Sequence, residues 1–368
     1  MAQIRIAIAG VGNCASSLVQ GLAYYASGAE GDDRAVGLMH EQIGGYRVGD
    51  IRVVAAFDID RRKVGRPLEE AILAPPNNTT VFAAPPPTGV RVQMGPLLDG
   101  LAPHMRQFPT EQRFDPADAP PVDVARVLRD SGAQVLVNYM PVGAQKASEY
   151  YASACLDADV ALVNCVPVFI VSDGVWAGRF AQRGLPCVGD DIKAQVGATI
   201  THRTLVRLLV ERGMSIDCSY QLNVGGNSDF LNMLSRERLA SKKISKTEAV
   251  QSQLDAPLPA DRLHIGPSDF VPFLKDNKVC FLRIEGRGFG GVSMNLELRL
   301  SVEDSPNSAA VVVDAIRCCK LALDRGLRGP IEPVCAWTMK HPPRQMHDDQ
   351  AKAAMERFIR SRSPVAKD

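Results

Sequence analysis

The sequence predicts an α/β fold in which both ends of the chain build a parallel sheet and an α+β insert carries a mostly antiparallel sheet. Strands and helices alternate regularly through residues 134–189, as expected where crossover helices join parallel strands. From about residue 200, apolar and polar residues instead alternate with period two. We therefore expect a first domain of residues 1–199 and 305–368 and a second domain of residues 200–304.

The first strand leads into a glycine-rich turn. The β-branched run Ile4–Ala9 is followed by Gly10-Val11-Gly12-Asn13-Cys14-Ala15 and then by helical spacing. The pattern G-x-G-x-x-A between a strand and a helix is typical of Rossmann domains, which bind dinucleotides. Gly10 permits the tight turn, Gly12 lets the backbone approach a pyrophosphate, and Ala15 lets the helix pack closely. The alternative is an ordinary strand-to-helix turn.

An acidic residue at the end of the second strand would bind the ribose of such a cofactor. The next apolar run, Val53–Asp60, offers Asp58. The usual separation from the glycine motif is ~20 residues, and here it is much longer. Residues 28–50 must therefore form an insertion, which weakens the assignment of Asp58 to the ribose hydroxyls.

Three further strands are predicted at 134–139, 160–164 and 186–189, separated by helices near 122–130, 145–158 and 174–183. Ligands bind at the carboxyl ends of parallel strands, and these ends carry Asn138, Asn164 and Asp190. The three residues are therefore candidates for the cofactor site, although each could equally be a turn or cap residue.

The segment between Asp60 and Pro121 breaks this alternation. It is rich in proline and asparagine, with Pro75-Pro76-Asn77-Asn78 and Pro85-Pro86-Pro87. Because regular strands and helices resume after it, we interpret it as a surface excursion of the first domain and not as a linker.

The second domain contains strands over 218–224, 280–285 and 293–300, whose alternation indicates one exposed face. That face or its edges could pair with another subunit. An amphipathic helix over 308–325 then returns to pack on the first domain. Cys318 and Cys319 on this helix are expected to be small core residues.

Lysines four residues apart are the most informative feature of the second domain. Ser241–Lys246 places Lys242 and Lys246 on one helical face, so that two ammonium groups can meet one anion. A glycine-rich turn and helix cap over 223–229 precede them, and Lys278 follows a turn predicted at 266–269. Asp304 and Lys340 lie further on. For any single lysine, the alternative is a solvated helix face.

Composition excludes several functions. The chain has 368 residues and 42 Lys+Arg against 41 Asp+Glu, which gives no reason to expect nucleic acid or an acidic membrane surface. Nine irregularly spaced cysteines and no secretory leader favour reduced thiols in a cytoplasm. No apolar run is long enough to cross a bilayer, and no zinc motif or G-x-S-x-G elbow is present.

Together these motifs resemble the myo-inositol-phosphate synthases in their short actinobacterial form. The resemblance covers almost the whole chain and rests on five segments: 10–18, 188–199, 223–229, 241–246 and 304–308. It implies a redox-neutral cyclisation of a hexose 6-phosphate, namely glucose 6-phosphate, to 1L-myo-inositol 1-phosphate, with NAD that is tightly held and regenerated. It also implies a homotetramer and leaves open a monovalent or divalent cation near the cofactor phosphates.

The same resemblance implies roles for individual residues. Lys242 would shuttle the C5 hydroxyl proton, while Lys246 and Lys340 would face oxygens that become anionic and Lys278 would support the enolate and phosphate. Asp229 and Asp304 would orient these ammonium groups. The substrate site comprises Asn227, Ser228, Lys242, Lys246, Lys278 and Lys340. The cofactor site comprises Gly10, Gly12, Asn13, Cys14, Asp58, Asn138, Asn164 and Asp190.

The chain departs from the family pattern beside the expected pocket, at Asn138, Cys165, Ser228 and Val279. A paralogous cyclase that closes fructose 6-phosphate to a five-membered cyclitol phosphate, for carbocyclic nucleoside biosynthesis, is therefore an alternative. A catalytically silent NAD-binding protein and a net dehydrogenase are further alternatives. Retention of all four matched lysines argues against the silent protein, and a dehydrogenase would accumulate NADH.

Overall fold

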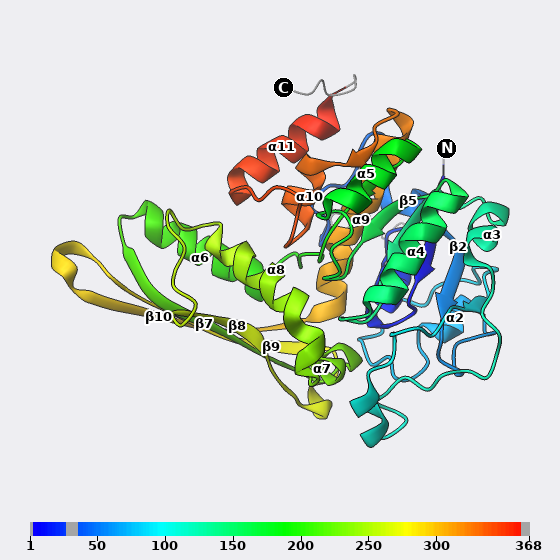
Figure 1. The fold of residues 1–368 in the computed structure, drawn as a ribbon, viewed down its shortest axis with the longest axis horizontal. Coiled ribbons are helices and arrows are strands. Elements are labelled where there is room, and N and C mark those ends of the chain that lie inside the picture. The colour runs from blue at the N-terminus through cyan, green and yellow to red at the C-terminus, as the bar shows by residue number, and fades with distance from the viewer. Residues whose placement is uncertain (1–2, 27–35, 362–368) are drawn as a thin grey trace.

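The computed structural model describes residues 3–26 and 36–361, which form two β-sheets and the helices that cover them (Figure 1). The larger sheet has seven strands in the order β11-β6-β5-β4-β1-β2-β3, and every neighbouring pair is parallel. The order 3-2-1-4-5-6 within it is that of a Rossmann fold. The predicted α/β fold class is confirmed.

The bounds of the first-domain elements follow the chain. They are β1 Ile4–Ala9, α1 Asn13–Ala26, β2 Ile51–Asp58, α2 Leu68–Ala71, β3 Val92–Met94, α3 Val124–Asp130, β4 Val135–Asn138, α4 Gln145–Ala158, β5 Ala161–Asn164, α5 Gly174–Arg183 and β6 Pro186–Val188. After the second domain come α9 Asp304–Asp324, β11 Gly329–Pro330, α10 Glu332–Thr338 and α11 Asp348–Arg360.

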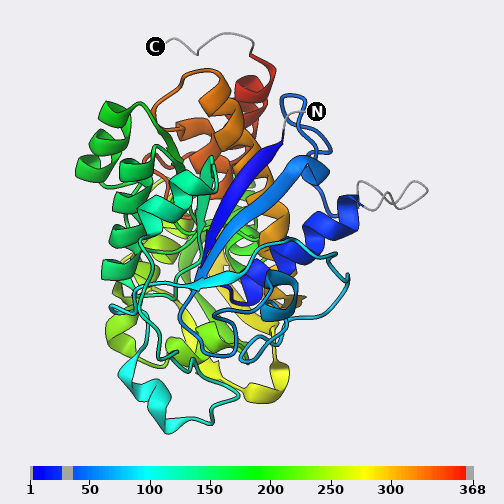
Figure 2. The same cartoon turned by 90° about the vertical axis from the view of Figure 1, so that its right-hand side faces the viewer.

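Helices cover both faces of the seven-stranded sheet, which explains its continuous apolar strands. The helices α3, α4 and α5 pack on one face, and α1, α9 and α10 pack on the other (Figures 1 and 2). The strands β4, β5 and β6 are buried at every position. This packing fixes the carboxyl ends of β1, β4, β5 and β6 along one edge of the sheet.

The second sheet has the order β10-β9-β7-β8. Its elements are α6 Ala198–Glu211, β7 Ser215–Gly225, α7 Ser228–Asn232, α8 Ala240–Gln251, β8 Leu263–Phe270, β9 Asn277–Arg287 and β10 Ser293–Glu303. Two of its three strand pairs are antiparallel, and β7 pairs with β8 in parallel. The turn predicted at 266–269 is wrong, because these residues continue β8 despite the Gly-Pro sequence there.

Two other sequence interpretations need correction. Residues 60–121 are not wholly a surface excursion, because β3 joins the edge of the sheet beside β2. The helix α9 lies where it was expected but is not amphipathic, because the sheet, α1 and α10 surround it and residues from Ser305 to Ala322 are mostly buried. Cys318 and Cys319 are core residues, as predicted.

The predicted insertion at 28–50 lies partly outside the described residues, which exclude 27–35. Its described part, residues 36–50, is fastened to α9 by Arg317, whose guanidinium donates to the carbonyls of His40 and Glu41 at 2.8 and 3.0 Å. Within residues 3–26 and 36–361, no helix is both long enough and apolar enough to cross a membrane.

Candidate active site

A cavity lies where the carboxyl edge of the seven-stranded sheet meets the second domain. Residues from both parts of the chain line it, and they include most of the predicted site residues. Those that line it are Gly10, Gly12, Asn13, Cys14, Asp58, Asn227, Ser228, Asp229, Lys242, Lys246, Lys278, Asp304 and Lys340. The structure therefore brings the glycine motif and all four candidate lysines to one site.

The glycine motif has the conformation that a dinucleotide requires. Gly10 has φ +95°, and a Cβ there would lie 2.6 Å from the carbonyl oxygen of Tyr139, so no side chain fits. Gly12 has no atom within 4 Å of an added Cβ, which leaves its cavity side open. The amide of Val11 donates to Asp58 Oδ2 at 2.7 Å and so holds the turn.

Asp58 is nearly buried in the cavity wall, and its carboxylate is largely engaged by backbone. Besides Val11, the amides of Ile59 and Asp60 donate to Oδ1 at 2.7 and 2.8 Å. Lys63, a residue that the sequence analysis missed, donates from Nζ to the carbonyl of Val11 at 2.8 Å. The end of β2 therefore shapes the glycine turn as well as facing the cavity.

The structure does not bring Asn138, Asn164 and Asp190 to the cavity wall. They form a fully buried chain behind it, in which Asn138 Nδ2 donates to Asn164 Oδ1 and Asn164 Nδ2 donates to Asp190 Oδ1, at 2.8 and 2.7 Å. Burial raises the pKa of Asp190 to about 6, against the hydrogen bonds that it accepts. These residues fasten β4, β5 and β6 together, while their neighbours Tyr139, Cys165 and others face the cavity.

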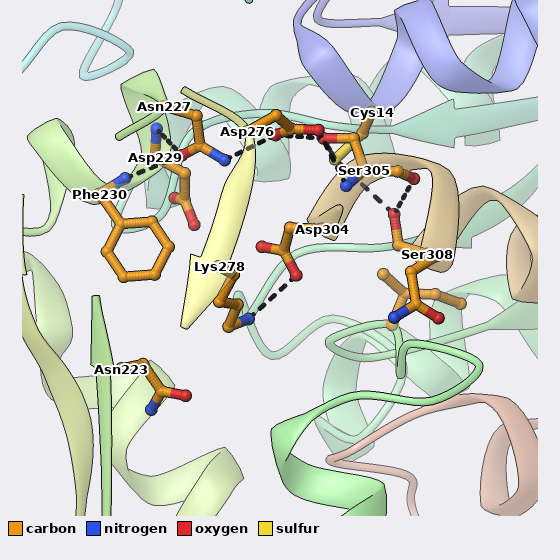
Figure 3. Close-up of polar contacts among 12 residues, drawn as sticks. Cys14, Asn223, Asn227, Asp229, Phe230, Asp276, Lys278, Asp304, Ser305 and Ser308 are labelled. Carbon is orange, nitrogen blue, oxygen red and sulfur yellow. Dashed lines mark hydrogen bonds and ion pairs between the residues drawn. The ribbon is translucent and has the colours of Figure 1, made fainter. Parts of the chain in front are cut away.

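A buried carboxylate, Asp276, joins the glycine motif to the second domain (Figure 3). Its Oδ1 accepts from Asn13 Nδ2 at 3.1 Å, Asn227 Nδ2 at 2.9 Å and Ser305 Oγ at 2.9 Å. Burial, with the nearby charge of Asp304, raises the pKa of Asp276 to about 6. Among the described residues no lysine, arginine or histidine forms an ion pair with this carboxylate.

Two of the predicted lysines pair with their predicted acidic partners. Lys242 Nζ on α8 lies 2.8 Å from Asp229 Oδ2, and Lys278 Nζ on β9 lies 3.0 Å from Asp304 Oδ1 (Figure 3). Burial lowers the pKa of Lys278, but the charge of Asp304 outweighs it, so the pKa is raised. These contacts give each ammonium group a fixed direction.

Lys340 has an acidic partner that the sequence analysis missed. Its Nζ donates to Asp191 Oδ1 at 2.9 Å and to the carbonyl of Ile192 at 2.6 Å. Asp191 Oδ2 accepts from Ser245 Oγ of α8 at 2.6 Å. Asp191 directly follows Asp190 in sequence, and its left-handed conformation, with φ +61°, turns it from the buried network toward the cavity.

Lys246 differs from the other three lysines, because among the described residues no carboxylate pairs with it. It is 4% exposed and faces the cavity. Burial, with the charges of Lys242 and Lys278, lowers its pKa well below the ordinary value. A buried cation without a partner is costly, so the cavity is suited to a ligand that brings negative charge.

The amino terminus of α6 also faces the cavity. Gly197 caps this helix without a side-chain hydrogen bond, and Ala198, Thr199 and Ile200 line the cavity. The free amides and dipole at a helix start favour an anion. In the second domain, Asn227 caps α7 and accepts from the amides of Asp229 and Phe230.

Other lysines and thiols of the region are outside the chemistry. Lys243 and Lys275 are exposed and do not line the cavity. Burial, with the charges of Asp276 and Asp304, raises the pKa of Cys14 to about 12, which keeps this thiol protonated. No group of three or more His, Cys, Asp or Glu side chains that could hold a metal is found within residues 3–26 and 36–361.

Comparison with known proteins gives consistent matches. A family model described as myo-inositol-1-phosphate synthase matches residues 197–305. The inositol-3-phosphate synthase of Mycolicibacterium smegmatis is 54% identical over 361 residues, which cover 97% of this chain and 98% of that protein.

Two solved structures are also similar. Ari2 has a TM-score of 0.77 at 33% identity, and a myo-inositol-1-phosphate synthase-related protein from Thermotoga maritima has a TM-score of 0.79 at 25% identity. Each match covers 97% of this chain and 98% of the other. The matched regions therefore include both the glycine motif and the lysine-bearing second domain.

Proposed function

The chain belongs to the myo-inositol-1-phosphate synthase family, and from this membership we propose that it converts glucose 6-phosphate to 1L-myo-inositol 1-phosphate. The observation that carries the proposal is the convergence of four lysines on the cavity that also contains the glycine motif. Plain hydride transfer needs no such group of cations. An enolate and an alkoxide, which form during cyclisation, do.

NAD fits the cavity at the glycine motif. Gly10 and Gly12 leave the backbone open to a pyrophosphate, and Asp58 faces the place where a ribose would lie. When bound, NAD would supply oxidation of the C5 hydroxyl and the later reduction of the C5 ketone, without net change. Everything else would be done by residues of the chain.

The lysines would hold and move protons at defined oxygens. Lys242 would take the C5 hydroxyl proton, and Asp229 would keep its ammonium in place. Lys246 and Lys340 would stabilise the oxygens that become negative after C6 loses a proton and after C6 attacks C1. Lys278, held by Asp304, would support the enolate and phosphate region.

The substrate phosphate would lie between the start of α6 and the unpaired ammonium group of Lys246. Both features favour an anion, and both line the same cavity. Asn227 and Ser228 would contact the sugar at the opposite wall. Binding at both ends would leave the reacting carbons between the lysines.

We also propose a cation at Asp276 and Ser305, beside Asn13 of the glycine motif. The buried Asp276 carboxylate has no cationic partner among the described residues, and Asp304 adds negative charge nearby. Carboxylate, hydroxyl and amide oxygens suit a hard cation. Its charge would neutralise Asp276 beside the cofactor phosphates.

Product identity tests the proposed function against its alternative. We expect purified protein with NAD to convert glucose 6-phosphate to an inositol phosphate without net NADH, as followed by carbon and phosphorus NMR and absorbance. Turnover of fructose 6-phosphate alone to a five-membered ring would contradict the proposal and support the paralogous cyclase. Accumulation of NADH would indicate a dehydrogenase instead.

We propose a homotetramer in which residues 200–304 provide the subunit contacts. The helices α6 and α8 cover one face of the four-stranded sheet and leave the other uncovered within the chain (Figure 1). Phe281 is 44% exposed on that face and Tyr220 is 37% exposed, whereas Leu282 and Ile284, which point the other way, are buried. Exposed aromatic side chains of this kind are typical of interfaces.

Substitution of Phe281 tests this assembly. We expect Phe281→Glu to reduce the tetramer to smaller species in sedimentation velocity at micromolar concentration, because a carboxylate would be buried without a partner. Phe289→Glu is the control, because this fully exposed residue lies in the β9–β10 turn. A tetramer that survives Phe281→Glu would place the interface elsewhere.

A further inference from the structure

The C-terminal helix α11 contacts the catalytic region through its first residue, Asp348. Arg203 of α6 grips this carboxylate with two hydrogen bonds, from Nε to Oδ2 at 3.1 Å and from Nη2 to Oδ1 at 3.0 Å. Lys193 Nζ lies 3.5 Å from Oδ1. Arg203 and Lys193 are almost fully buried, and neither lines the cavity.

Arg203 extends this contact to the helix that carries two of the candidate catalytic lysines. Its Nη1 donates to the carbonyl of Ala249 at 2.5 Å and to Ser252 Oγ at 3.1 Å, at the end of α8. Lys246 lies one turn before Ala249 on this helix. The position of α8 relative to α6, and hence of Lys246 relative to the start of α6, therefore depends on Arg203.

The same carboxylate reaches the wall that carries Lys340. The amide of Lys193 donates to the carbonyl of Thr338 at 2.8 Å, and its Nζ donates to the carbonyl of Ala336 at 2.8 Å. Lys193 follows Asp191, the partner of Lys340, by two residues. Asp348 thus lies between the supports of two walls of the cavity.

We propose that Asp348 is a positioning residue that holds α8 and the Asp191–Lys340 pair in their relative places, an inference that rests on the proposed function. Two buried cations, Arg203 and Lys193, share this one carboxylate. Removing its charge would leave both without a full partner, and repulsion between them would move Arg203 away from Ala249. The lysines of the cavity would then lose their common geometry without losing a single contact to substrate.

The test compares Asp348→Asn with Asp349→Asn. The control removes the same charge from the same helical turn, but Asp349 is exposed and makes no contact with Arg203 or Lys193. We expect Asp348→Asn to lower kcat at least 10-fold while the Kd for NAD changes less than 2-fold, because the glycine motif lies apart from Asp348. The control should change neither. Wild-type kcat in folded Asp348→Asn would overturn the inference.

Hydrogen exchange gives a readout that does not depend on turnover. In Asp348→Asn we expect amides of α8 to exchange at least 10-fold faster than in the wild type, whereas loosening confined to α11 would indicate a merely structural role and overturn the inference. A wild-type protein that does not cyclise glucose 6-phosphate would contradict the proposed function and leave this exchange test valid.

A longer carboxylate covers the case in which Asp348→Asn does not fold. Asp348→Glu keeps the charge but moves the carboxylate by one methylene, so it cannot keep both bonds to Arg203 in place. We expect kcat to fall at least 3-fold with an unchanged Kd for NAD. Wild-type kcat and wild-type exchange in α8 would then overturn the inference.

Discussion

Replacing Lys246 by methionine should lower kcat for glucose 6-phosphate by about 10³-fold, which corresponds to ~4 kcal/mol of transition-state stabilisation. Methionine keeps most of the volume of the side chain and removes its charge. Lys246 is the buried lysine with no carboxylate partner among the described residues, so its charge is available to an anionic intermediate. Measurement of kcat and KM by product formation, with NAD at saturation, gives the effect.

Lys243→Met is the matched control, because Lys243 is exposed on the same helix and does not line the cavity. It should leave kcat unchanged within about 2-fold. The free energy of unfolding should rise or stay the same in Lys246→Met, since a buried unpaired charge is removed. Full activity in a folded Lys246→Met protein would remove this residue from the mechanism.

The low pKa of Lys246 has a functional consequence. Burial and the neighbouring ammonium groups of Lys242 and Lys278 favour its neutral form. An anion that forms beside it favours the charged form, so the group gains a proton at the stage at which negative charge develops. Lys278 has the opposite balance, because Asp304 raises its pKa and keeps it charged throughout. Neighbouring lysines in one cavity therefore have different protonation behaviour.

Much of the fold could be predicted from the sequence because its signals are local. The run Ile4–Ala9, the glycines after it and the alternation through residue 189 each show one element and its neighbours. The strand β3 was missed because it is only three residues long and lies among prolines. The Gly-Pro sequence in β8 was read as a turn, yet pairing with β7 along its length keeps it extended.

The candidate site was predictable where a residue type carries its own chemistry, as for the four lysines, Asp229 and Asp304. It was not predictable where position alone decides. Asp190 and Asp191 are adjacent and chemically identical, but one is buried in the strand network and the other pairs with Lys340. Likewise, nothing local distinguishes Asp276, whose role follows from contacts to residues far away in the sequence.

Gly12→Ala should weaken NAD binding by about 30-fold or more, which corresponds to ~2 kcal/mol, while the protein without cofactor stays as stable as the wild type. A methyl group at this position meets no protein atom within 4 Å, so folding is not strained. It projects from the glycine motif where the backbone must approach the pyrophosphate. The Kd from titration calorimetry and the free energy of unfolding of cofactor-free protein separate the two effects.

Gly21→Ala in α1 provides the control, because an added methyl group there is equally free of contacts but Gly21 does not line the cavity. It should leave the Kd for NAD unchanged and raise the free energy of unfolding by up to about 1 kcal/mol, as alanine favours a helix. Added NAD should stabilise the wild type and Gly21→Ala more than Gly12→Ala, because stabilisation grows with ligand concentration relative to Kd. Equal NAD affinity in all three proteins would show that the dinucleotide does not approach Gly12, and the cofactor would have to bind elsewhere in the cavity.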